Sequence, residues 1–273
     1  MSRTIQEKRA DFHALHARGC FVIPNPWDVG SAKMLAGLGF KALATTSSGF
    51  AWTQGRPDNG VPRDVVLGHL RTLVAATDLP LNADFESGYA KDLIGVAESV
   101  RMAVDTGVAG LSIEDSTYDA SNPLRKIEDA VARIRAARAA IDESRTETLL
   151  VGRAENFIVG RPDLDDTITR LKAYAAAGAD CLYAPGIRTR EQITAVVAAV
   201  APKPVNFLIV APGEFTVKDI AEMGVRRISV GGALARSAWG GFMRVAKQIA
   251  EEGRFEALST AASGKELNEF FAK

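Results

Sequence analysis

Short apolar stretches alternate along the chain with longer amphipathic ones. Eight of the short stretches are rich in β-branched and aromatic residues and recur at fairly even spacing. They cover residues 20–25, 41–48, 79–86, 110–115, 148–155, 181–186, 204–210 and 226–232. The stretches between them carry apolar residues at helical spacing and end in glycine, as at 92–107 and 163–178. This alternation predicts a parallel (β/α)8 barrel of the TIM type.

The chain is predicted to form one domain, because no Pro/Ser-rich linker or low-complexity segment interrupts it. An extra helix is expected at 1–19, the barrel at 20–252 and a helical segment at 253–273. An open doubly wound sheet would carry a glycine-rich phosphate turn after its first strand. The stretch "NPWDVGSA" stands at that position and lacks the fingerprint, which favours the barrel.

Composition narrows the function classes. The 273 residues include 33 basic and 33 acidic ones, and no basic face is evident, which argues against nucleic acid as a partner. No run reaches the length of a membrane span, and the first residues show no apolar signal region. The two cysteines, Cys20 and Cys181, lie in apolar runs and are expected to be buried thiols. We therefore expect a protein of the cytoplasm.

The carboxyl ends of the expected strands carry most of the candidate chemistry, and active sites of such barrels form there. In chain order these ends supply Asn25; Thr46, Ser47, Ser48 and Gly49, with Asp58 on the loop beyond; Asp84 and Glu86; Glu114 and Asp115; Arg153 and Glu155; Tyr183; Asn206; and Gly231 and Gly232. Each acid alone would suit a helix cap or a solvated loop. Together, on neighbouring strands, they indicate a site for a hard cation.

The acids favour Mg²⁺, with Mn²⁺ as an alternative, because carboxylate oxygens are the preferred ligands of both ions. Asp84 and Glu86 would share one face of an extended strand, so a cation between them is expected to offset their repulsion. The histidines His13, His16 and His69 fall in helices outside the barrel, and no lysine ends a strand. A zinc site and a Schiff-base aldolase are both disfavoured.

Donors for an anionic substrate accompany the acids. The "TTSSG" stretch offers hydroxyls and a glycine that lets amides approach an anion, and Arg153 offers a planar fork for a carboxylate or phosphate. A turn, and a buried ion pair of Arg153 with Glu155 or Asp115, are the structural alternatives. A cation beside carboxylate donors describes a site for 2-oxo or 2-hydroxy acids, in which the cation would stabilise an enolate.

Six motifs, in this order, resemble the isocitrate lyase/phosphoenolpyruvate mutase superfamily: "TTSSG", "GRPDNGVP", "NADFESGY", "LSIEDS", "VGRAEN" and "PVNFL". The resemblance implies a barrel whose last helix packs on a neighbouring subunit, usually in a homotetramer. It implies Mg²⁺ held by Asp84, Glu86 and Glu114, largely through water. It also implies that Ser48 and Gly49 bind the substrate carboxylate, with Arg153 beside it and Asp58 near the reacting group.

The chain departs from the family pattern in four places, one of which is "YAPG" at the end of the sixth strand, where Glu or His is usual. The stretch "IEDSTYDASNPLRKIEDA" has neither the Cys nor the His of the loop found in lyases that act on isocitrate and 2-methylisocitrate. Ser116 stands where the mutases and phosphonopyruvate hydrolases carry lysine, and Glu86 replaces the commoner Asp. The pattern is closer to divergent members such as oxaloacetate decarboxylases.

The predicted function is a Mg²⁺-dependent lyase that breaks a carbon–carbon bond, by retro-aldol cleavage or decarboxylation, in a small 2-oxo or 2-hydroxy acid through an enolate. We expect either Tyr118, Tyr183 or Asp58 to position water. The expected catalytic residues are Asp58, Arg153, Glu114 and Tyr183; the expected substrate-binding residues are Thr46, Ser47, Ser48, Gly49, Arg153 and Asn206. Three alternatives are a phosphorus–carbon enzyme, a barrel that binds a sugar phosphate at "SVGGALAR", and a non-catalytic metabolite-binding barrel.

Apolar side chains continue beyond the expected barrel. The last twenty residues include Phe255, Leu258, Leu267, Phe270 and Phe271. These are too many apolar groups for an isolated solvated tail. We expect the segment to pack on a partner subunit, as a helix-swapped dimer within a tetramer; packing on its own barrel is the alternative.

Overall fold

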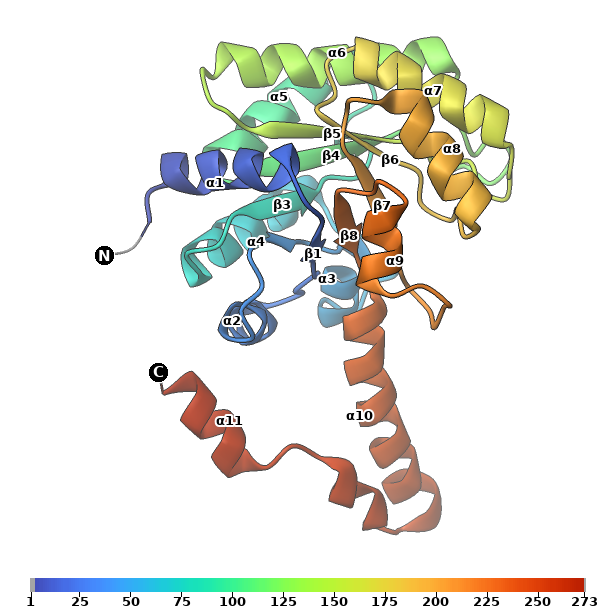
Figure 1. The fold of residues 1–273 in the computed structure, drawn as a ribbon. Helices are drawn as coiled ribbons and strands as arrows, with labels where there is room; N and C mark the ends of the chain where they lie inside the picture. The colour runs from blue at the N-terminus through green and yellow to red at the C-terminus, as the bar shows by residue number, and fades with distance from the viewer. Residues whose placement is uncertain (1–2, 273) are drawn as a thin grey trace.

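A computed structural model describes residues 3–272 and arranges them around one sheet of eight parallel strands (Figure 1). The strands are β1 (Phe21–Ile23), β2 (Leu43–Ala44), β3 (Leu81–Asp84), β4 (Gly110–Glu114), β5 (Leu149–Arg153), β6 (Cys181–Tyr183), β7 (Val205–Leu208) and β8 (Arg227–Ser229). Their order in the sheet is β1-β8-β7-β6-β5-β4-β3-β2. Strands β3 to β7 each pair with both of their neighbours in the sequence, and β8 pairs with β7 and β1, as a barrel requires.

Helices alternate with the strands, and most of them cover the outside of the sheet. They are α1 (Ile5–Ala17), α2 (Val29–Gly37), α3 (Ser47–Thr53), α4 (Arg63–Ala76), α5 (Leu93–Asp105), α6 (Ile127–Glu143), α7 (Leu164–Ala176), α8 (Arg190–Val200), α9 (Val217–Glu222), α10 (Ala233–Glu252), the short 3-10 helix η1 (Glu256–Thr260) and α11 (Gly264–Phe271). Asp92, Asp163 and Thr189 cap α5, α7 and α8 by accepting a backbone N–H in the first turn of each helix.

The barrel closes between its two edge strands. Ala44 N donates to Pro24 O (3.1 Å), and Asn25 Nδ2 donates to Thr45 O (2.8 Å). Asn25 Oδ1 accepts the backbone N–H groups of Val230 and Gly231, which ties β1 to the end of β8 as well. The predicted (β/α)8 fold is confirmed.

Helix α1 covers the amino end of the barrel. Phe12 is fully buried, and a Cβ at Gly110 would lie 2.7 Å from its ring, so glycine makes room for it. Above it, the buried Arg227 side chain crosses the barrel and donates to Asn206 Oδ1 (2.8 Å) and Asn82 Oδ1 (3.3 Å). With this end filled, the open end is the carboxyl end of the strands.

The main apolar core lies between the sheet and the helices, where fully buried residues such as Leu111 and Leu171 pack. Cys181 is buried and Cys20 is half-buried, and both thiols are free, so only the first is as buried as expected. Burial raises the pKa of both thiols and keeps them protonated. Among residues 3–272, no helix combines the length and apolar character needed to cross a membrane.

All eight strands are shorter than the predicted ranges, and two of these differences affect the acid-bearing end of the barrel. The stretch 41–48 forms only the two-residue β2, and the chain turns at Thr46 into α3, whose first turn is capped by the Thr46 hydroxyl. Strand β3 ends at Asp84, and Glu86 has a left-handed backbone (φ 48°). Asp84 and Glu86 therefore do not project from one extended strand, contrary to the prediction.

The C-terminal segment departs from the barrel. Helix α10 extends away from the strands, and α11 returns toward α2 (Figure 1). Apart from Ala235, α10 has no buried residue, and Trp239, Phe242 and Met243 are exposed. The Phe270 ring packs on Gly37 in α2, where a Cβ would lie 2.5 Å from it. The end of the chain thus touches its own barrel, while the apolar side of α10 stays uncovered.

Candidate active site

A cavity of about 140 Å³ opens at the carboxyl ends of the strands. It is small beside the ~300–1,000 Å³ pockets that hold drug-sized ligands, so it suits a small metabolite. Its lining includes Thr46, Ser47, Ser48, Asp58, Asp84, Arg153 and Tyr183 from the predicted set, together with Asn25, Asn82, Ser112, Leu208, Val210, Arg227, Ser229, Gly231 and Gly232. Most of the residues predicted from the strand ends meet in this one place.

Arg153, at the end of β5, is the centre of the acid cluster. Its Nη1 lies 3.2 Å from Asp84 Oδ1 and 3.2 Å from Glu114 Oε2. Its Nε and Nη2 donate to the two carboxylate oxygens of Glu155, and its guanidinium lies over the Tyr183 ring. Burial disfavours its charge, but Glu114 and Glu155 outweigh this effect and raise the pKa of Arg153 well above its usual value. The positive group between Asp84 and Glu114 is an arginine.

Negative charge remains in excess around Arg153. The cluster has one guanidinium and four nearby acids, which are Asp84, Glu86, Glu114 and Glu155. A fifth acid, Asp58, also lines the cavity. Burial raises the pKa of Glu114 well above its usual value. Burial also raises the pKa of Glu86 to about 7, against the opposing effect of its hydrogen bond from Tyr89. In both acids the effect of burial outweighs the opposing effect of Arg153 on the pKa.

The charge and the oxygen donors of this cluster fit a divalent cation. Within residues 3–272, no group of three or more His, Cys, Asp or Glu side chains is gathered closely enough to enclose an ion. Mg²⁺ is commonly bound by one or two carboxylates and completes its shell with water. A divalent ion at this site would therefore have to keep much of its water.

The segment after β2 supplies hydroxyls to the cavity. Ser47 N donates to Asp84 Oδ2 (3.1 Å), and the Thr46 and Ser48 hydroxyls lie 3.1 Å apart. Gly49 is buried and its N–H donates to Thr46 Oγ1. Gly49 accordingly lies outside the cavity lining, and its place in substrate binding stays a prediction.

Asn206 lies deeper than expected. It is fully buried, donates to Ser229 Oγ (2.9 Å) and accepts from Arg227, and it does not line the cavity. Asp115 also has a structural environment: it accepts from Tyr174 Oη (2.6 Å), Arg170 Nη1 (3.1 Å) and Glu155 N (2.8 Å). Of the two ion pairs considered as structural alternatives for Arg153, the one with Glu155 is present.

The family model for phosphoenolpyruvate phosphomutase matches residues 12–250. The chain belongs to this family. The match covers the barrel and most of α10, and the resemblance predicted from the six motifs is confirmed.

Three relatives place the chain within the phosphomutase family. The structure of a protein of Burkholderia cenocepacia J2315, classed as a lyase or mutase, is 46% identical with a TM-score of 0.95, over 98% of both chains. The oxaloacetate decarboxylase of Paraburkholderia xenovorans (strain LB400) is 30% identical over 78% of this chain and 71% of its own. The structure of an oxaloacetate acetylhydrolase in complex with oxalate is 26% identical with a TM-score of 0.86, over 97% of this chain and 94% of the other.

The segment that differs from other family members lies directly over the acids. An isolated antiparallel bridge joins Ser116 to Leu124, which folds residues 116–124 back on themselves. At the turn, Tyr118 has a left-handed backbone (φ 61°), and its hydroxyl accepts from Ser87 N (2.9 Å) and donates to Glu114 Oε1 (3.1 Å). Tyr118 thus takes its place in the site through a loop conformation that the sequence does not display.

Tyr89 also lies at the acids, and it was not predicted from the sequence. Tyr89 Oη donates to Glu86 Oε1 (2.7 Å). Glu86, Gly88 and Tyr89 all have positive φ, so the "ESGY" turn folds the tyrosine back toward the acid. Gly88 is the one feature of the sequence that could have indicated this turn, because glycine favours turns.

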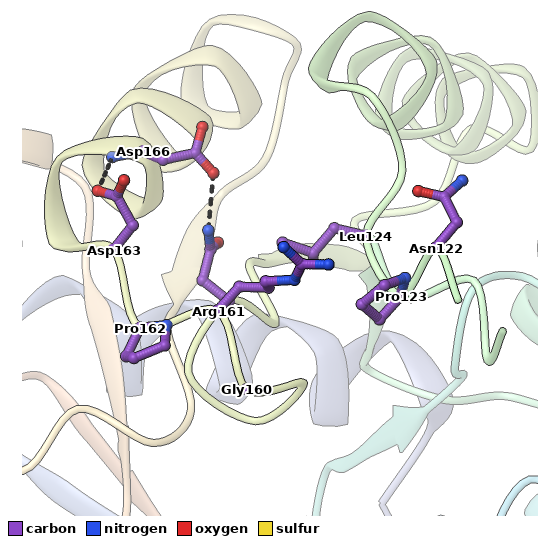
Figure 2. A pocket seen from close by; sticks show the side chains of 9 residues that line it. Asn122, Pro123, Leu124, Gly160, Arg161, Pro162, Asp163 and Asp166 are labelled. Carbon is purple, nitrogen blue, oxygen red and sulfur yellow. Dashed lines mark hydrogen bonds between the residues drawn. The ribbon is translucent and has the colours of Figure 1, made fainter. Parts of the chain in front are cut away.

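A larger groove, of about 560 Å³, lies on the outer side of the 116–124 segment and carries none of the acids bound to Arg153. Figure 2 shows the Arg161 side chain extending from beside Pro162 toward Leu124. Asp166 accepts a hydrogen bond from the side-chain amide of Asn156. Because the groove holds no group from the strand ends, the smaller cavity remains the candidate active site.

Proposed function

We propose that this protein is a Mg²⁺-dependent lyase that breaks a carbon–carbon bond in a small 2-oxo acid, with decarboxylation of oxaloacetate or a close analogue as its reaction. The observation that carries the proposal is the cluster centred on Arg153: buried carboxylates exceed the positive charge, beside a small cavity with hydroxyl donors. The family and the two oxaloacetate-acting relatives support this choice.

Asp84, Glu86 and Glu114 would hold the ion, with water between it and part of this set. When bound, Mg²⁺ polarises an oxygen at carbon 2 of the substrate and favours the negative charge of an enolate. Mn²⁺ prefers the same oxygen donors. Asp84 is the central residue of the three, because it pairs with Arg153 through one oxygen and accepts the Ser47 backbone N–H at the other.

Arg153 and the hydroxyls of the β2 segment would bind the substrate carboxylate. A guanidinium has five N–H donors. Those on Nε and Nη1 face carboxylates, and one of the two on Nη2 donates to Glu155. One N–H is left for substrate, so we assign the remaining carboxylate contacts to Ser47 and Ser48, which line the cavity.

Decarboxylation suits the groups above the acids better than cleavage of isocitrate. Carbon dioxide leaves as a neutral molecule, and the enolate then needs one proton. Tyr118, hydrogen-bonded to Glu114, is placed to orient the water that supplies it. Asp58 and Tyr183 line the cavity itself and are the other candidates for this role. No cysteine lies in the 116–124 segment to protonate a departing enolate.

Chemistry on a carbon–phosphorus bond is the second candidate, because the family bears the name of a phosphomutase. A phosphonate dianion calls for several cationic donors. No lysine among residues 3–272 lines the cavity. Arg227 is engaged with Asn206 and Asn82, and Arg153 has one N–H to give. The surplus of negative charge favours the carbon–carbon reaction.

The assembly we propose is a homotetramer built from helix-swapped dimers. The support is the uncovered apolar side of α10, where Phe242 is 63% exposed and Met243 48%. Phe270 contacts α2 of its own chain, and this contact does not support an exchange of the whole 253–273 segment. The cytoplasmic location stays a prediction.

The proposed reaction is tested with a panel of acids. Protein and Mg²⁺ are mixed separately with oxaloacetate, 2-methylisocitrate, dimethylmalate and phosphonopyruvate, and pyruvate release is followed. We expect turnover of oxaloacetate. Turnover of phosphonopyruvate alone would move the assignment to the second candidate, and turnover of none would contradict both.

A further inference from the structure

His69, in α4, has a buried polar atom that the fold leaves without a partner. Its ring is stacked on Phe50, with centroids 3.7 Å apart and 9° between the planes. Among the residues that the structure describes, none bonds its buried Nε2. Burial lowers the pKa of His69 to about 4, so its ring is neutral at neutral pH. A buried polar atom without a hydrogen bond costs roughly 1–3 kcal/mol, so a partner is expected.

A small cavity of about 10 Å³ lies between His69 and the acid cluster. That is close to the ~10–15 Å³ that one water molecule needs. Its lining is Thr45, Thr46, Ser47, Phe50, Val61, Val66, His69, Asp84, Glu86 and Tyr89. The wall toward α4 is apolar except for the imidazole, and the wall toward the strands carries the carboxylates. A water here would have polar partners on both sides.

The two acids at this cavity differ in what already binds them. Asp84 is satisfied at both oxygens, by Arg153 Nη1 (3.2 Å) and by Ser47 N (3.1 Å). Glu86 accepts from Tyr89 at Oε1, and a carboxylate has about four acceptor sites, so it has capacity for a further donor. Its left-handed backbone also means that neighbouring contacts must hold it in place.

We propose that His69 is a positioning residue for Glu86: its Nε2 bonds one water held in this small cavity, and that water donates to the Glu86 carboxylate. The inference rests on the proposed function, in which Glu86 helps to hold the cation. The imidazole does not touch substrate or ion. It fixes the carboxylate from behind, much as outer hydrogen bonds orient the ligands of metal sites.

The test compares His69→Phe with His69→Gln. Phenylalanine keeps a flat ring for the stack on Phe50 and removes the nitrogen, whereas glutamine retains a polar group that can reach the water. The readouts are Mn²⁺ binding by titration calorimetry, kcat and KM for oxaloacetate at saturating Mg²⁺, and the melting temperature. His13→Phe, on the exposed side of α1, is the matched control.

We expect His69→Phe to weaken Mn²⁺ binding by about 10–100-fold. Its KM for oxaloacetate at saturating Mg²⁺ and its melting temperature should stay near the wild-type values. His69→Gln should recover most of the Mn²⁺ affinity, and His13→Phe should bind as the wild type does. Equal Mn²⁺ affinity in His69→Phe and wild type would overturn the proposal, as would a loss in His69→Gln as large as in His69→Phe.

A high-resolution crystal structure of the wild type supplies a second readout that needs no activity. We expect ordered water in the cavity, within hydrogen-bonding distance of His69 Nε2 and the Glu86 carboxylate; an empty cavity contradicts the inference even if the enzyme is active. If the water is present and Mn²⁺ binds but no acid is turned over, the proposed function fails and the role of His69 stands.

Discussion

Replacing Arg153 with methionine removes the guanidinium that joins the buried Glu114 and Glu155 to the half-buried Asp84. The side chain is only 17% exposed, and Asp84, Glu114 and Glu155 all lie within salt-bridge distance of it. Breaking a buried pair by removing one partner costs about 3–5 kcal/mol, because the other charge is left uncompensated. We therefore expect Arg153→Met to lower the free energy of unfolding by about 3–5 kcal/mol and kcat/KM by at least ~10²-fold.

Glu155 offers an internal check on this magnitude. It is nearly fully buried and receives two of the Arg153 hydrogen bonds. In the wild type, Glu155→Gln should destabilise, since it removes the charge from those bonds. In the Arg153→Met background the same change should stabilise, because it removes an uncompensated charge. Hydrogen bonds to charged groups contribute about 1.5–3 kcal/mol, so the coupling energy of this cycle should be at least that large.

The assay is urea unfolding followed by circular dichroism, at one fixed protein concentration because subunit association also contributes to stability. Activity is measured in parallel as pyruvate release. The reasoning is refuted if Arg153→Met unfolds within 1 kcal/mol of the wild type, or if Glu155→Gln has the same sign of effect in both backgrounds.

Three further predictions concern other parts of the chain. Tyr118→Phe keeps the ring but loses the hydrogen bond to Glu114, so kcat should fall by about 10²-fold with little change in KM; an unchanged kcat would remove Tyr118 from the reaction. Burial lowers the pKa of His16 from 6.5 to about 3, so between these values the unfolded chain binds the extra proton and stability falls as the pH falls. From pH 7.5 to 5.0 the wild type should lose about 2 kcal/mol more than His16→Gln in urea unfolding, and parallel pH profiles would contradict this. Solution scattering at micromolar concentration should give about four times the 29.1 kDa of one chain, and a monomeric mass would rule out helix exchange through α10.

Regular alternation made the barrel predictable. In a parallel barrel the strand ends meet at one rim, so locating the strands also located Thr46, Ser47, Asp84 and Arg153 at a common site. The pleat separates neighbouring residues as well: Glu114 faces Arg153, while Asp115 turns to the helices and binds Arg170. That difference could have been read from the alternation within the strand.

Other features depended on contacts between distant segments. An arginine side chain lies between Asp84 and Glu114 because Arg153 reaches them from β5. No local sequence pattern predicts how far that side chain reaches. Tyr89 and Tyr118 reach the acids from turns with left-handed residues that are not glycine, a conformation held by surrounding contacts. The unpartnered nitrogen of His69 is visible only once α4 is placed against the strand ends.

The most direct test of the central claim is the metal dependence of oxaloacetate turnover in the wild type and in Asp84→Ala. Asp84 lies at the junction of Arg153, the β2 segment and the proposed cation site. Its loss removes a clustered negative charge, so circular dichroism should show an intact fold. We predict that the wild type releases pyruvate with Mg²⁺, loses this activity in EDTA and regains it on addition of Mg²⁺ or Mn²⁺, and that Asp84→Ala shows no metal-dependent turnover. Full activity of Asp84→Ala with an unchanged metal response, or rapid formation of glyoxylate from isocitrate by the wild type, would contradict the account.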